Sequence, residues 1–211
     1  MSMSKGQSPS IEYRLAPGAN VNWRDTRSLK SLELIRNCRL HADDPIIDVS
    51  GGPPLLIASL LEAGLTDLTV ISGSAAVLKT LADCAGDRAN RLTLIEHDVI
   101  GFHPQRRYAL WHDREVFHSL THAEERQQYV ESLEEALRPG GHLVLSTFGP
   151  DGPQEYGGVP VRRYSPRTLS EELGSQFELA DDSFSMHQAP SGDVQQYLHC
   201  HFRRHAPGQR S

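Results

Sequence analysis

An aspartate, a serine and two glycines follow a short apolar run near the first quarter of the chain. The segment reads Pro45-Ile46-Ile47-Asp48-Val49-Ser50-Gly51-Gly52-Pro53-Pro54-Leu55-Leu56, which indicates a strand, a glycine-containing turn and the start of a helix. Glycines let a ligand approach the backbone closely, and the first turn of a helix carries unpaired N–H groups and a partial positive charge. This turn is therefore a candidate site for a nucleotide-type cofactor, held by Asp48, Ser50, Gly51 and Gly52.

Polar side chains follow the next three apolar runs of the chain as well. In chain order, these candidate residues are Ser72, Asp98 with its neighbour Val99, His112, Asp113 and His118. Open α/β sheets bind ligands outside the carboxyl ends of their parallel strands, so polar residues that follow strands are candidates for a site. A carboxylate there can accept hydrogen bonds from a ligand, and an imidazole or carboxylate can orient or deprotonate a nucleophile.

The apolar pattern predicts strands and helices in alternation. Strands are expected at residues 46–49, 68–71, 92–95, 108–111, 142–148, 177–179 and 194–202. Helical spacing begins at residue 28 and ends before Asp44, and further helices are expected at 55–64, 75–84, 122–137 and 165–174. Thr121 and Glu124 have the spacing of a capping box for the helix that they precede, and residues 138–141 are expected to form a turn.

This alternation with short connections predicts an α/β fold. We expect a Rossmann-like, doubly wound, seven-stranded sheet, mostly parallel, with helices on both faces. Only a loop separates the last two strands, so the last strand is predicted to be antiparallel. Residues 1–27 are expected to be a flexible arm, residues 28–205 one domain and residues 206–211 a tail. The arm, with Trp23, and the Gly/Pro-rich loop 149–164, with Tyr156, are expected to close over a substrate.

The order of the elements and the residues at the strand ends resemble the class I S-adenosylmethionine-dependent methyltransferases. The resemblance spans roughly residues 28–204 and rests on the segments 48–52, 96–99, 111–114 and 137–141. It is strongest to a small bacterial subgroup whose fourth strand ends in Trp-His-Asp-Arg followed by Val-Phe-His, as residues 111–118 do here. The resemblance implies S-adenosyl-L-methionine as the cofactor and methyl transfer to a small molecule or a single protein side chain.

The resemblance also implies a role for each residue of the cofactor site. Asp48 would accept hydrogen bonds from the cofactor's amino group or from loop N–H groups, with simple bracing of the loop as the alternative. Gly51 and Gly52 would permit close approach of the methionine portion. Asp98 would accept from the adenine amino group while Val99 packs on the ring, and a turn or cap is the alternative for Asp98.

Three residues are candidates for the methyl-transfer step. Asp113 stands where the resemblance places a residue that faces the reacting groups, although an ion pair with Arg114 is the alternative. His112 and His118 would orient or deprotonate the acceptor, line its pocket, or brace the loop after the fourth strand.

The cofactor surface departs from the family pattern at two places. Ser50 stands where the family has glycine, Pro53 and Pro54 stand where it usually has small residues, and the prolines remove backbone donors. Ser72 stands where the family has an acidic residue for the ribose hydroxyls, a deficit of about 1.5–3 kcal/mol or roughly ten- to a hundredfold in affinity. An alternative hypothesis is therefore a catalytically degenerate protein of this fold that serves as a binding or regulatory module, or one that takes another adenosine-bearing ligand through Asp98.

Composition and spacing argue against several other classes of function. The net charge is −6, which disfavours nucleic acid as a partner, and the three cysteines form no paired motif. We expect a cytoplasmic protein without leader or membrane anchor, either a monomer or a homodimer. His118 and His122 are four residues apart, but nothing near them completes a ligand set, so no metal site is expected. His199 and His201 are expected on a solvated face of the last strand.

Overall fold

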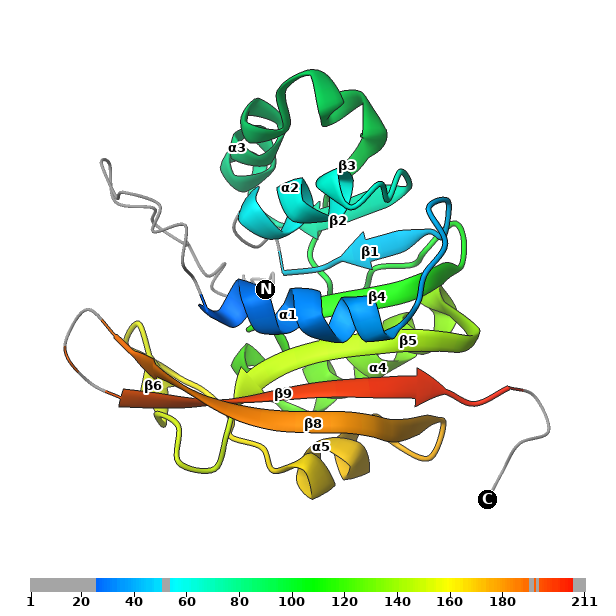
Figure 1. The fold of residues 1–211 in the computed structure, drawn as a ribbon. Coiled ribbons are helices and arrows are strands. Elements are labelled where there is room, and N and C mark those ends of the chain that lie inside the picture. Colours follow the sequence, from blue (N-terminus) through cyan, green and yellow to red (C-terminus); the bar gives the residue numbers. More distant parts are fainter. Residues whose placement is uncertain (1–25, 51–53, 190–191, 193, 207–211) are drawn as a thin grey trace, which may run out of the picture.

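The computed structural model describes residues 26–50, 54–189, 192 and 194–206 of the 211-residue chain. Seven strands form one sheet in the order β3-β2-β1-β4-β5-β9-β8 (Figure 1). Their bounds are β1 Ile46–Asp48, β2 Leu68–Ser72, β3 Leu92–Glu96, β4 Tyr108–Arg114, β5 Leu137–Phe148, β8 Phe177–Gln188 and β9 Val194–Arg204. The strands β1 to β5 are parallel, and β9 is antiparallel to both neighbours, β5 and β8. The predicted fold class and the antiparallel last strand are confirmed.

Helices cover both faces of the sheet (Figure 1). One layer holds α1 Thr26–Asn37, α2 Pro54–Glu62 and α3 Ala75–Ala85, and the other holds α4 Ala123–Ala136 and α5 Pro166–Leu173. Successive strand residues point to opposite faces, so Ile46 packs in the core of the first layer and Ile47 in that of the second. Two short 3₁₀ turns, η1 Gly86–Arg91 and η2 Phe117–Ser119, and a small hairpin of β6 Glu155–Tyr156 with β7 Val159–Pro160 complete the described elements.

Local side-chain chemistry explains where several helices begin. The first residue of α2 is Pro54, a position where a missing N–H costs little. The hydroxyl of Ser74 accepts from the Val77 N–H at the start of α3, and Ser165 and Thr168 exchange hydrogen bonds at the start of α5. At α4 the carboxylate of Glu125 accepts from the His122 N–H. The predicted pair of Thr121 and Glu124 is therefore wrong by one residue.

Strand β4 is longer than the sequence pattern predicted. It continues through His112, Asp113 and Arg114 because β5 pairs with it as far as the register Arg114↔Ser146. The predicted loop residues are thus strand residues whose side chains alternate between the two faces of the sheet.

The segment 138–141, predicted as a turn, lies inside β5. The register moves from Tyr108↔Leu137 to Leu110↔His142, so extra residues of β5 form a bulge opposite β4. Gly140 has a φ of +74° there, a left-handed conformation that glycine adopts without strain. The regular part of β5 begins at His142, as expected.

The last two strands are also more extensive and more buried than expected. β8 spans Phe177–Gln188 rather than three residues, and residues 197–202 of β9 are all buried. His199 lies between two hydroxyls, with Ser146 Oγ 2.8 Å from Nδ1 and Ser185 Oγ 2.7 Å from Nε2. The prediction that His199 and His201 share a solvated face is wrong, because α1 and the neighbouring strands cover it.

The loop 149–164 and the N-terminal arm were both expected to close over a substrate. Within residues 149–164, the β6–β7 hairpin packs Tyr156 against Phe148, with ring centroids 5.6 Å apart. Residues 1–25 of the predicted arm, including Trp23, lie outside the described residues, and residues 26–27 belong to α1. Among the helices that the structure describes, none is both long and apolar enough to cross a membrane.

Candidate functional site

Asp48 lies at the centre of a hydrogen-bonded cluster at the carboxyl end of β1. Its carboxylate accepts from the Ser50 N–H at 3.1 Å and from the Ser50 hydroxyl at 2.9 and 3.0 Å. His112, its register partner on β4, places Nδ1 2.6 Å from Oδ2 of Asp48. The hydroxyl of Ser31 on α1 lies 2.9 Å from the other ring nitrogen of His112. This cluster ties the turn after β1 to β4 and α1.

The cluster is buried and electrostatically self-consistent. Asp48 is 2% exposed and His112 is fully buried. Burial alone would raise the pKa of Asp48, but the hydrogen bond and charge of His112, with help from Ser50, hold that pKa below its ordinary value. The ionised carboxylate therefore braces the Ser50 turn, the alternative role considered for Asp48. Gly51 and Gly52, predicted next to it, lie outside the described residues.

Ser72 and Glu96 stand side by side at the ends of β2 and β3. The hydroxyl of Ser72 accepts from the Ser74 N–H at 3.2 Å, which leads the chain into α3. The sheet register pairs Ser72 with Glu96, an exposed carboxylate that sequence reasoning missed. The sequence contains the signal for Glu96: β2 and β3 are parallel neighbours of equal length, so the fifth residue of one strand pairs with the fifth residue of the other.

Asp98 is exposed and begins a tight turn after β3. Its Oδ1 accepts from the Ile100 N–H at 3.0 Å, so the turn role considered for Asp98 is present. Val99, beside it, is buried at 6% exposure and packs in the core that also holds Phe102. The Asp98 carboxylate is exposed, so a ligand can reach it without displacing core side chains.

Asp113 faces the opposite layer from Asp48 and His112. It is fully buried, and its carboxylate accepts from the N–H groups of Val116 and Phe117 and from the Tyr129 hydroxyl, the last at 2.7 Å. The indole N–H of Trp111 donates to that same hydroxyl. Asp113 thus caps η2 rather than pairing with Arg114, whose side chain points to the other face of β4.

Burial dominates the ionisation of Asp113. It raises the pKa of this carboxyl to about 6, although the hydrogen bonds from Tyr129 and from the Val116 backbone act in the opposite direction. Two of the residues predicted to act at one acceptor, His112 and Asp113, therefore point to opposite faces of the sheet, because β4 continues through them.

His118 is the member of that trio with an unsatisfied polar atom. Its ring stacks on Phe148, with centroids 4.3 Å apart, and the side chain is 2% exposed. Its Nδ1 has no hydrogen-bond partner in the part of the chain that the structure describes. Burial lowers the pKa of His118 from 6.5 to about 3, so the ring is neutral at physiological pH.

Solved structures with the same arrangement of elements are numerous. The N-methyltransferase NodS from Bradyrhizobium japonicum WM9, in complex with S-adenosyl-L-homocysteine, superimposes with a TM-score of 0.70 at 17% identity, covering 88% of this chain and 89% of NodS. The 1,6-didemethyltoxoflavin N1-methyltransferase of Burkholderia thailandensis has a TM-score of 0.68 at 20% identity, covering 86% and 79%. This chain has the class I methyltransferase fold.

The same fold also supports other chemistry. The [4+2]-cyclase SpnF superimposes with a TM-score of 0.66 at 16% identity, covering 85% of this chain and 81% of SpnF. No model of a protein family matches the sequence, and no curated protein matches it. The methyltransferase fold is therefore established by structure, while the reaction has to be argued from the site.

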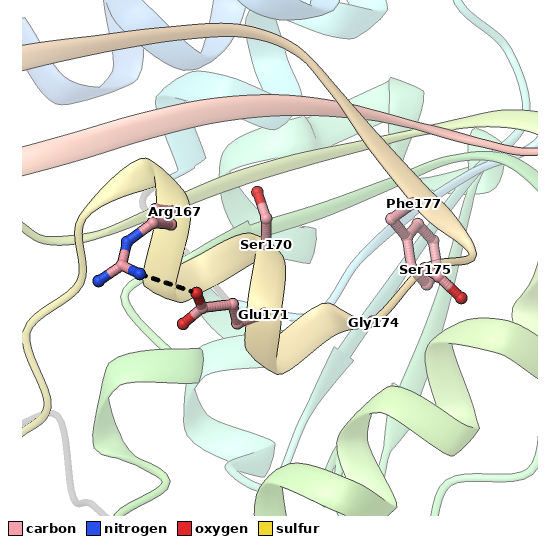
Figure 2. A pocket seen from close by; sticks show the side chains of 6 residues that line it. All are labelled: Arg167, Ser170, Glu171, Gly174, Ser175 and Phe177. Carbon is pink, nitrogen blue, oxygen red and sulfur yellow. Dashed lines mark hydrogen bonds and ion pairs between the residues drawn. The ribbon is translucent and has the colours of Figure 1, made fainter. Parts of the chain in front are cut away.

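Figure 2 shows a surface hollow along α5 and the start of β8. It is lined by Arg167, Ser170, Glu171, Gly174, Ser175 and Phe177. Phe177 pairs with Arg204 at the end of the sheet where β1 to β5 begin, so this hollow is at the opposite edge from Asp48 and Asp98. It does not contribute to the candidate site.

We expect His118→Phe to reduce the loss of stability in acid. The unfolded chain protonates this histidine near pH 6.5, whereas the folded chain resists until about pH 3. The folded protein therefore keeps its full stability well above pH 6.5, and its free energy of unfolding falls by up to about 1.4 kcal/mol per pH unit as the pH drops from 6.5 toward 3. Phenylalanine preserves the stacking on Phe148 and removes this term.

Urea unfolding at pH 7 and pH 5 measures the effect. The difference between the two free energies should be smaller in His118→Phe than in the wild type. Identical differences in wild type and His118→Phe would contradict the burial argument. His142 and His201, whose pKa values are also lowered by burial, keep part of the acid sensitivity in every variant.

Proposed function

We propose that this protein is an S-adenosylmethionine-dependent methyltransferase that acts on a small molecule or a single protein side chain. The strand order reverses between β1 and β4, and open α/β sheets bind ligands at the carboxyl ends of strands beside such a reversal. Asp48 and His112 meet at that point and brace the turn toward α2. This braced turn at the reversal is the observation that carries the proposal.

The described residues fit an adenosyl cofactor. Asp98 offers an exposed acceptor for an adenine amino group beside the apolar side chains of Val99 and Ile100, and Ser72 and Glu96 offer a hydroxyl and a carboxylate for ribose. When bound, S-adenosylmethionine supplies a methyl group on an already activated sulfonium. The protein then contributes mainly proximity and orientation.

The candidate catalytic residues take different roles in this proposal. His118 has a buried, neutral Nδ1 that lacks a hydrogen-bond partner within the described part of the chain. This nitrogen can accept a hydrogen bond from the substrate that receives the methyl group, and so orient the lone pair of the substrate's reacting atom. Its low pKa makes it a weak base, which favours orientation over proton abstraction. Asp113 is a positioning residue, because it caps the backbone of η2, which carries His118. His112 positions the Asp48 turn through its two ring nitrogens.

Calorimetric titration with S-adenosyl-L-homocysteine tests the proposal. Binding of one ligand per chain is the expected result, and no heat at millimolar ligand would refute it. We expect Ser72→Asp to increase the affinity by about tenfold, because a carboxylate makes charge-assisted bonds to ribose hydroxyls. The gain is limited by the adjacent Glu96 carboxylate, which repels the new charge.

Ser72→Asn is the matched control for that substitution. It has nearly the same shape as aspartate without the charge, so it should give little or no gain. An equal gain for both variants would mean that shape rather than charge sets the affinity. No gain for either would place the ribose away from β2 and would not by itself refute binding of the ligand.

A further inference from the structure

Cys38, His142 and His201 bring three metal-ligating atoms together from three elements. The sulfur of Cys38 lies 3.6 Å from Nε2 of His201, and Nδ1 of His142 lies 2.8 Å from the same nitrogen. All three ligand atoms lie within 4.8 Å of one another. The residues are more than fifty positions apart in sequence, so no spacing motif identifies them, and no metal site was predicted from the sequence.

The cluster lies between the end of α1 and the sheet. Cys38 directly follows α1, His142 begins the regular part of β5 after its bulge, and His201 is on the neighbouring β9. Cys38 and His201 are buried, at 7% and 8% exposure, and His142 is partly exposed. In the sheet register, His142 pairs with Leu110 and Leu110 pairs with Ile46, the first residue of β1. Asp48 is the last residue of that strand. The cluster is therefore separate from the candidate methyltransferase site.

The spacing is close to that of tetrahedral zinc. With Zn–S of about 2.3 Å and Zn–N of about 2.0–2.1 Å, a sulfur and a nitrogen ligand stand about 3.5 Å apart and two nitrogens about 3.3 Å apart. The distance from Cys38 to His201 already matches. The two imidazoles need to separate by about 0.5 Å. The ligand atoms of Cys38 and His142 lie within 4.8 Å of each other and need to stand about 3.5 Å apart, and the partly exposed His142 ring can move to reach that distance.

We propose that Cys38, His142 and His201 form a zinc site that joins α1 to β5 and β9. Zinc would take one thiolate sulfur and two imidazole nitrogens, with a water molecule in the fourth position. The Cys38 thiol releases its proton to solvent, and its hydrogen bond to the Leu34 carbonyl is lost. The proton that the two imidazoles share moves to the far nitrogen of its ring, so that both facing nitrogens offer lone pairs.

The surroundings of the cluster are mixed in charge. Burial lowers the pKa of His142 to about 4 and also lowers that of His201, so both rings are neutral and can act as ligands at physiological pH. Burial raises the pKa of Cys38 to about 12, so without metal the thiol stays protonated. Arg138 and Arg203 oppose a cation here, while Asp44 and Asp181 favour one. Met186 pairs with Gln196 of β9, well along the strand from His201, so its thioether cannot serve as the axial ligand of a blue-copper site.

Cobalt and zinc binding to the full-length reduced protein tests the proposal. One equivalent of Co²⁺ should produce the intense visible bands of tetrahedral cobalt and a near-ultraviolet thiolate-to-cobalt band, and Zn²⁺ should displace both. X-ray absorption of the zinc-loaded wild type should show one sulfur at about 2.3 Å and nitrogen or oxygen ligands at about 2.0–2.1 Å. This measurement needs no variant, so it decides the question even if a substitution prevents folding.

Variants then identify the ligands. Cys38→Ser should abolish the thiolate band, and His142→Gln and His201→Gln should each weaken zinc binding by about a hundredfold or more, since even outer-shell partners of metal sites contribute 10–100-fold. Cys84→Ser, at an exposed cysteine, is the matched control and should change nothing. Zinc without a sulfur neighbour, binding that follows Cys84, or binding that survives Cys38→Ser would overturn the proposal.

Discussion

Replacing Asp113 by alanine should lower the free energy of unfolding by about 3–5 kcal/mol. Three donors would lose their acceptor inside the protein: the N–H groups of Val116 and Phe117 and the hydroxyl of Tyr129. Each buried donor left without a partner costs about 1–3 kcal/mol. Removing Asp113 also removes the cost of burying its carboxyl, the cost that raises its pKa, but this saving offsets only part of the loss. Urea denaturation at pH 7 measures the change.

Two further variants separate the contributions. Tyr129→Phe removes one of the three donors to Asp113 and the acceptor of the Trp111 indole, so it should cost about 1–2 kcal/mol. Asp113→Asn keeps one acceptor oxygen, but its NH₂ group faces one of the three donors. Its loss of unfolding free energy should therefore lie between those of Asp113→Ala and Tyr129→Phe. A cost below about 1 kcal/mol for Asp113→Ala would contradict the capping role and would reopen the role at the reacting groups that sequence reasoning gave this residue.

Replacing Asp48 by alanine should weaken binding of S-adenosyl-L-homocysteine by about a hundredfold, if the proposed function holds. The turn after β1 loses the hydrogen bonds that the Ser50 N–H and hydroxyl donate, and the buried His112 loses the carboxylate beside Nδ1. A turn that is no longer fixed must be ordered by the ligand, and that cost appears as lost affinity of about 3 kcal/mol. Calorimetry on protein shown to be folded by circular dichroism gives the value.

Graded controls accompany this measurement. Ser50→Ala removes only the hydroxyl contacts to Asp48 and should weaken binding by less than tenfold. Asp67→Ala removes another carboxylate, which pairs with Arg106 at the surface, and should leave affinity unchanged. If Asp48→Ala binds as tightly as the wild type, the braced turn does not hold the ligand and the site must lie elsewhere on the fold.

Sequence reasoning succeeded where the determining interactions are local or strictly periodic. Apolar alternation located every strand of the sheet, Ser165 marked the start of α5, and the loop between the last two strands predicted the antiparallel pairing of β9. The bracing roles considered for Asp48 and Asp98 depend on backbone groups two residues away, and both contacts are present. Their cofactor roles remain predictions.

Only the tertiary structure decided which residues share a face or meet across the sheet. The length of β4 depends on its pairing with β5, and that pairing puts Asp113 on the opposite face from His112. His199 is buried because β8 is long enough to bring Ser185 beside it. The convergence of Cys38, His142 and His201 depends on the bulge in β5 and on the end of α1, which no short segment specifies. Hydrophobic periodicity and capping are encoded within a few residues, so the sequence alone determined the fold class. Strand register and the face to which a side chain points are set by contacts between distant segments, so only the tertiary structure decided which side chains meet.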